Sequence, residues 1–133
     1  MERWLGRWSE QTYAIFRMVV GALFLQHGLQ KVFGMLGADP AHTWEHLDAQ
    51  MKLGGVIELV GGTMVLIGLQ TGWAAFVCSG TMAVAFFQMH FKADLPLPIQ
   101  NKGELAVLYC FAFLFIAAKG SGIWSISGRR RAA

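Results

Sequence analysis

Six ionisable side chains lie within or at the ends of the long apolar stretches of this chain. A charge at the centre of a lipid bilayer costs about 3 kcal/mol, so such residues usually face other helices and mark a functional site. Carboxylates, imidazoles and amines can hydrogen-bond a small molecule or pass protons between one another. These types therefore predict a polar pocket or a proton relay. The six residues are Arg17, His27, Lys31, Glu58, His90 and Glu104.

Four apolar stretches carry these residues, and each approaches the ~20 residues that a helix needs to cross ~30 Å of hydrocarbon. They cover residues 13–33, 51–69, 72–91 and 99–118, and Pro96 and Pro98 limit where the last of them can begin. Hydrophobic residues make up 55% of the 133 residues and charged residues only 14%. We expect an all-α integral membrane protein, an antiparallel bundle of four transmembrane helices forming one domain over residues 1–133. A soluble helical bundle is the alternative.

Basic residues near the chain ends predict the orientation of this bundle. Arg3, Arg7, Lys119 and the run 129–131 flank the outermost spans, whereas the loop after the first span is acidic. Lys and Arg collect on the cytoplasmic side, so both termini are expected there, in a bacterial inner membrane. The arginine run can also contact anionic lipid head groups. No interleaving of basic and aromatic residues indicates nucleic-acid binding.

In this orientation most of the polar residues fall in the outer half of the membrane. The first span contributes His27, Gln30 and Lys31, the second Glu58, the third Gln88 and His90, and the fourth Glu104. We expect them to bind a ligand or relay protons; the alternative is a set of hydrogen bonds that only clamp the helices. For His90 and Glu104, near the interface, both interpretations stay open. Arg17 lies near the cytoplasmic end, where it could extend to the interface as a structural charge.

Glycines recur at helical spacing beside these charges. Gly54 and Gly61 flank Glu58 at i−4 and i+3, and Gly21 and Gly28 follow Arg17 on the first span. Small residues allow transmembrane helices to approach closely. We therefore interpret the glycines as packing residues.

The residues that commonly hold metals or cofactors give little signal. The segment from His42 to His46 reads His-Thr-Trp-Glu-His, which matches the zinc pattern His-x-x-Glu-His, but an interfacial turn is expected instead. Cys78 and Cys110 are placed roughly 10 Å apart in depth, too far for a disulfide, and are expected in the core. We predict no metal site, and no haem or flavin signal is present.

Short motifs recur along nearly the whole chain. They are Arg17, Gly21, Phe24, His27-Gly28 and Lys31-Val32-Phe33-Gly34, then Gly55, Glu58, Gly61-Gly62 and Gly68, and finally Asn101, Gly103-Glu104 and Gly120-Ser121-Gly122. In this order and spacing they resemble the DoxX family of small four-helix bacterial membrane proteins. That family usually has a further glycine where this chain has Lys102.

The resemblance implies a membrane protein associated with respiratory redox work, since related chains are similar to a membrane subunit of thiosulfate:quinone oxidoreductase. Our hypothesis is a quinone-interacting accessory subunit in which Glu58, His27 and Lys31 bind the head group or relay its protons. A redox partner protein or a second copy of the chain would complete it, within membrane lipid. The alternative is a non-enzymatic scaffold or small-molecule carrier.

Overall fold

The computed structural model describes the backbone of residues 1–132 and the side chains of residues 1–129, and within these limits it is helical. The side chains of Arg130 and Arg131, two of the residues that predict orientation, lie outside the described part. The elements in chain order are α1 (Glu2–Leu5), η1 (Gly6–Trp8), α2 (Ser9–Phe33), η2 (Pro40–His42), η3 (Trp44–His46), α3 (Ala49–Ile67), α4 (Thr71–Ala85), η4 (Phe86–His90), α5 (Pro98–Asn101), α6 (Glu104–Lys119) and α7 (Ile126–Ala132).

Helices α2 and α3 form the first antiparallel pair. Gly34, in the left-handed conformation at φ 64°, ends α2, and Asp48 caps the start of α3 by accepting a hydrogen bond from the Met51 nitrogen at 2.8 Å. The two backbones touch: a methyl group added at Gly28 would lie 2.4 Å from the Leu59 nitrogen. Gly21 and Gly62 make the same kind of contact further along, so the interpretation of Gly21 and Gly28 as packing residues is confirmed.

Helices α4 and α6 form the second antiparallel pair. At its C-terminal end α4 continues as η4, a π-helical turn whose last bond joins the Phe91 nitrogen to the Phe86 oxygen at 2.8 Å. The expected fourth span began at residue 99, but α6 begins only at Glu104. The backbone breaks at Lys102, which has a φ of 60°, and leaves α5 as a separate turn.

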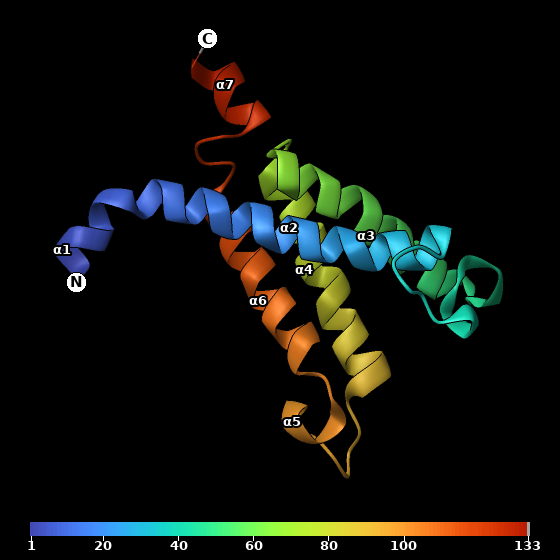
Figure 1. Ribbon diagram of the computed structural model, residues 1–133. Coiled ribbons are helices and arrows are strands. Elements are labelled where there is room, and N and C mark those ends of the chain that lie inside the picture. Colours follow the sequence, from blue (N-terminus) through green and yellow to red (C-terminus); the bar gives the residue numbers. More distant parts are fainter. Residues whose placement is uncertain (133) are drawn as a thin grey trace.

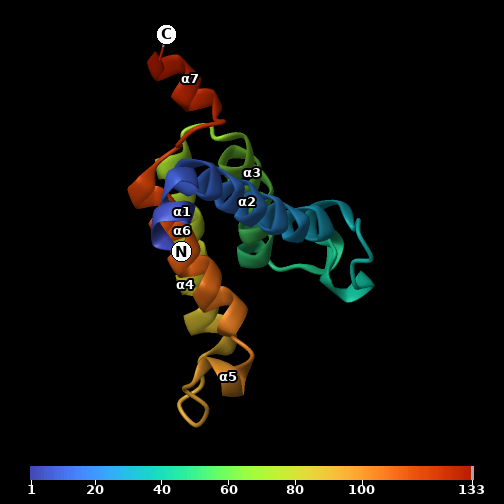
Figure 2. The same cartoon turned by 60° about the vertical axis from the view of Figure 1, so that its left-hand side comes forward.

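The two pairs meet at one end and diverge at the other. Figures 1 and 2 both show α2 crossing the upper part of the α4–α6 pair, while the far ends of α3 and η4 point away from each other. The fold is therefore all-α with antiparallel neighbours, as predicted, but the pairs spread apart instead of lying parallel in one bundle. Where they meet, Phe24, Val65, Cys78, Phe113 and Ile116 form the centre of a buried core.

Two of the helices in the described chain are long and apolar enough to cross a membrane, Ala49–Ile67 and Thr71–His90. Helix α6 has only 16 residues, and α2 carries Arg17, His27 and Lys31. Large apolar side chains cover much of the outside, among them Trp73, at 75% exposed, and Leu108, at 68%. Many large exposed apolar side chains are typical of a protein that faces lipid or a partner.

Candidate functional site: a cavity between the two helix pairs

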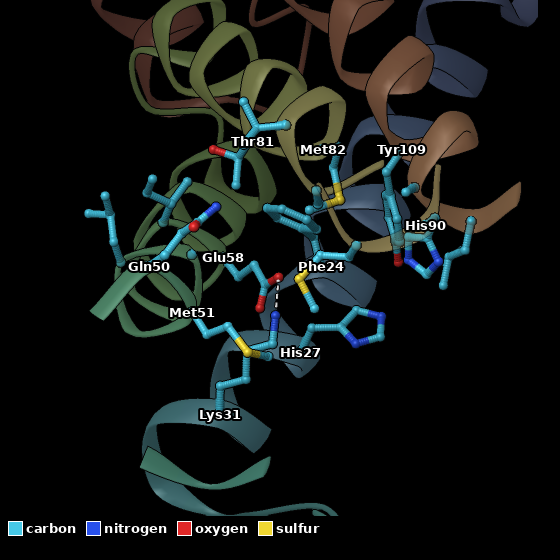
Figure 3. Close-up of a pocket in the computed structure, with 18 of the residues that line it drawn as sticks. Phe24, His27, Lys31, Gln50, Met51, Glu58, Thr81, Met82, His90 and Tyr109 are labelled. Atoms are coloured by element: carbon cyan, nitrogen blue, oxygen red, sulfur yellow. Dashed lines mark hydrogen bonds and ion pairs between the residues drawn. The ribbon is translucent and has the colours of Figure 1, made fainter. Parts of the chain in front are cut away.

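A cavity of about 550 Å³ opens where the two helix pairs diverge. Its walls are mainly apolar and include Phe24, Ile57, Met82 and Tyr109. Four of the predicted site residues line it: His27, Lys31, Glu58 and His90 (Figure 3). The structure thus brings together side chains from α2, α3 and η4 that are up to 63 residues apart in the sequence.

Glu58 is the buried charge of this cavity, with a side chain only 5% exposed. Its Oε1 accepts a hydrogen bond from Lys31 Nζ at 2.7 Å, while its Oε2 is buried and has no hydrogen-bond partner among the described residues. The close approach of α2 to α3 places the pair, because Gly55 leaves room for the stem of Lys31. A buried carboxylate normally has a hydrogen-bond donor at each oxygen, so the second oxygen of Glu58 is left unsatisfied in a residue that lines the cavity.

Gly54 lies one helical turn before Glu58 and borders the cavity rather than a helix contact. A methyl group added there would have no atom within 4 Å, whereas at Gly61 it would meet Cys78 Sγ at 2.4 Å. The prediction that Gly54 is a packing residue was therefore wrong. The missing side chain at Gly54 keeps open space beside the carboxylate.

An aromatic side chain that was not predicted from the sequence forms part of the opposite wall of the cavity. Tyr109 of α6 lies edge-on to the His27 ring, with ring centroids 6.1 Å apart, and packs on Phe24 at 5.3 Å. Figure 3 shows Tyr109 and His90 on the same side of the cavity, across from the Lys31–Glu58 pair. The available signal was a lone phenol inside an otherwise apolar span.

His90 lies at the end of the π-helical turn η4 and borders the cavity. Its Nδ1 lies 3.2 Å from the backbone oxygen of Asn101, and the Asn101 side chain in turn bonds Leu95 and Gly103. Lys102 follows and also lines the cavity. Since π-helical turns are frequent at functional sites, η4 is a suitable support for a ligand-facing histidine.

Three of the predicted site residues do not line the cavity. Gln30 donates to the Leu36 oxygen at 3.1 Å and so closes the end of α2. Gln88 accepts a hydrogen bond from Gln50, which itself borders the cavity. Glu104 is exposed at the start of α6, because the break at Lys102 begins that helix five residues later than expected.

Arg17 is a structural charge, but the prediction that it extends to the interface was wrong. It is completely buried. Its Nη1 donates to the oxygens of Val65 and Leu66, at 2.6 and 2.9 Å, and its Nη2 donates to the oxygen of Trp124 at 2.8 Å. The guanidinium therefore joins the last turn of α3 to the segment before α7, where a cation complements the free carbonyls.

The zinc-like segment does not form the helix that metal binding would need. His42 ends η2 and His46 ends η3, with Thr43 extended between them, so the two imidazoles do not share a helical face. His42 instead lies 3.2 Å from Asp39 Oδ2. Within the described chain, no group of three or more His, Cys, Asp or Glu side chains is placed to hold a metal.

Both cysteines are free, but the reason given for their separation was wrong. Ser79, the neighbour of Cys78, donates to the Cys110 oxygen at 2.8 Å, so the two cysteines lie at similar depth. They are kept apart because Cys78 Sγ faces Gly61 of α3, whereas Cys110 lies beside Ser79.

The chain resembles known proteins over most of its length. A family model, DoxX, matches residues 12–91, which hold Lys31, Glu58, His27 and His90. A Haemophilus influenzae protein named "Uncharacterized protein" is 37% identical over 131 residues, covering 94% of this chain and 95% of that one. "Putative oxidoreductase CatD" of Bacillus subtilis is 29% identical over 108 residues, covering 80% and 78%. No solved structure gives a significant match. Since the family model covers more than half of the chain, this protein belongs to the DoxX family.

Proposed function

We propose that this protein is a membrane subunit of a respiratory redox system and that its cavity binds the head group of a quinone. The observation that carries the proposal is the carboxylate of Glu58, which is buried, paired to Lys31 through one oxygen and unpartnered at the other. The DoxX match and the Bacillus subtilis relative, whose name includes oxidoreductase, support redox work.

The cavity suits a molecule with a flat ring and polar groups at opposite ends. Phe24 and Tyr109 provide aromatic surface, and Glu58 with Lys31 provides an acceptor and a donor on one side. A quinol hydroxyl would donate to Glu58 Oε2, and a quinone oxygen would accept from Lys31 Nζ or His27. Oxidation of a quinol releases two protons and two electrons; Glu58 would take one proton and His27 the other, and a redox partner protein would take both electrons.

The same proposal includes the membrane arrangement. We place α2, α3, α4 with η4, and α6 across the bacterial cytoplasmic membrane, with both termini in the cytoplasm. The apolar exterior and the two span-length helices support this arrangement, as does the basic character of the chain ends. The Glu58 cavity would then open in the outer half of the membrane.

A quinone titration tests the binding site. Purified protein in detergent is titrated with a short-chain quinol and its quinone, and binding is followed by quenching of tryptophan fluorescence. We expect Glu58→Gln to weaken quinol binding by about tenfold, because a hydrogen bond to a charged acceptor is lost. Glu104→Gln is the matched control, since Glu104 is exposed outside the cavity, and it should bind like the native chain.

A non-enzymatic scaffold is the second candidate, favoured by the position of the Lys31–Glu58 pair between α2 and α3. In that case the pair would only hold two helices together. Glu58→Gln would then lower the thermal unfolding midpoint, and neither the native chain nor the variant would bind quinol. That pair of results would refute the quinone proposal.

A further inference from the structure

A second cavity, of about 750 Å³, lies at the other end of α4. It is formed by the first turns of α4, the last turns of α6 and the segment leading into α7. Gln70, Thr71, Trp73, Phe76, Leu114 and Ser127 are among the residues that line it. It shares no lining residue with the cavity at Glu58.

The start of α4 opens into this cavity without a side-chain cap. The residue before the helix, Gln70, has a φ of 47°, a left-handed conformation that is unusual for a residue other than glycine. Its backbone N–H donates to Ser127 Oγ at 2.9 Å, which ties the C-terminal segment to this place. The first N–H groups of a 15-residue helix therefore carry their partial positive charge toward the cavity.

Thr71, the first residue of α4, gives an independent sign of a ligand. It is completely buried, and its Oγ1 has no hydrogen-bond partner among the described residues. A buried hydroxyl is normally satisfied, and this one borders a cavity that has room for a partner. The unused hydroxyl and the uncapped helix start thus offer hydrogen-bond donors to the same space.

The flanks of the cavity are apolar and face outward. Trp73 is 75% exposed and Phe76 is 59% exposed, and both continue the outer surface of α4. None of the described lining residues is acidic, and the C-terminal segment carries the exposed Arg129. Trp124, also exposed, lies in the segment just before α7. Tryptophan at the head-group level, donors inside and apolar surface alongside fit an amphipathic anion.

We propose that this cavity binds the phosphate group of an anionic phospholipid from the leaflet on the side of the chain termini. The Thr71 hydroxyl and the first backbone N–H groups of α4 hydrogen-bond the phosphate oxygens, as helix starts do with anions. The acyl chains lie along Trp73, Phe76 and Leu114. This site does not depend on quinone binding.

Native mass spectrometry of the whole chain in detergent tests the site. The protein is mixed with phosphatidylglycerol or with phosphatidylcholine of the same acyl chains, and retained lipid is counted. We expect phosphatidylglycerol to be retained at about tenfold lower concentration. Thr71→Val should remove most of this preference, because it deletes the hydroxyl and keeps the shape of the side chain. Thr63→Val is the matched control, since the Thr63 hydroxyl bonds the Leu59 oxygen of its own helix.

A second variant covers the case in which Thr71→Val does not fold. Ala118→Phe adds a ring to this cavity from an exposed position of α6, and it should also abolish the preference. Equal retention of the two lipids by the native chain would overturn the proposal. So would an unchanged preference in Ala118→Phe. In a third arm, displacement of the lipid by millimolar inorganic phosphate would show that free phosphate is the ligand and would overturn the assignment to lipid.

Discussion

Arg17 and Glu58 are buried charges on neighbouring helices, and their surroundings differ in one respect. Arg17 directs four donated hydrogen bonds to backbone oxygens of α3 and of the segment before α7, leaves only its Nε without a partner among the described residues, and lines neither of the two cavities. Glu58 uses one oxygen for Lys31, leaves the other without a partner among the described residues, and lines a cavity. In the sequence, Arg17 and Glu58 are similar, because each is a charged residue inside an apolar helix. Their hydrogen-bond partners separate the charge that holds the fold from the charge that can hold a ligand.

The largest expected effect comes from removing the Arg17 guanidinium. Arg17→Met keeps much of the side-chain volume but leaves the oxygens of Val65, Leu66 and Trp124 without their donor. We expect the free energy of unfolding to fall by roughly 3 kcal/mol, because several buried acceptors become unsatisfied at once. Glu58→Gln, which keeps a similar shape, should cost only about 1 kcal/mol. Thermal unfolding in detergent measures the loss of stability in both variants. Equal losses would contradict the distinction between the charge that holds the fold and the charge that can hold a ligand.

A pair of glycine substitutions tests the same distinction in the backbone. Gly28→Ala forces a methyl group to within 2.4 Å of the Leu59 nitrogen, and we expect a loss of about 2 kcal/mol as α2 and α3 separate. Gly54→Ala points into the open cavity and should leave the unfolding midpoint unchanged or slightly raised, since alanine favours a helix. A destabilising Gly54→Ala would show that the space beside Glu58 is filled by protein.

The smallest effect concerns an exposed charge, Asp39 in the loop between α2 and α3. The Ala41 N–H and the His42 side chain hold the pKa of Asp39 below its ordinary value of 3.8. The stabilisation is therefore present above that value and is lost as pH falls through the lowered pKa. Asp39→Asn should unfold at a slightly lower temperature than the native chain at pH 6, and the difference should shrink as the pH falls through the lowered pKa of Asp39. A difference that persists in acid would assign the effect to something other than charge.

The helices and the surroundings of Glu58 were predictable because they depend on local pattern. Apolar length gives each helix, and the depth of each residue along antiparallel neighbours places Glu58 at the level of Lys31 and His27. The short turn between α3 and α4 makes those two helices neighbours. Depth does not choose between the two possible partners of Glu58; in the structure the partner is Lys31, at 2.7 Å.

Other parts of the site depend on features that spacing does not encode. Depth does not give the rotation of a helix, so Gln30 and Glu104 were placed at the right end of the molecule but face away from the cavity. The burial of Arg17 depends on hydrogen bonds to carbonyls of the irregular segment before α7, and such carbonyls have no sequence signature. Tyr109 was not predicted as a site residue, because a phenol in an apolar run resembles an ordinary core residue. The divergence of the two helix pairs depends on packing across the whole core.

The bonds of Arg17 also have an order in time. The residue is made early, but Nη2 reaches oxygens 106 and 107 positions later, beyond the last long helix. During synthesis the guanidinium can therefore bond the end of α3 but must wait for Ile123 and Trp124 before all its contacts are complete. Until then the charge remains partly unsatisfied inside an apolar assembly. The hydrogen bonds from Nη2 can therefore form only after residues 123 and 124 have been synthesised.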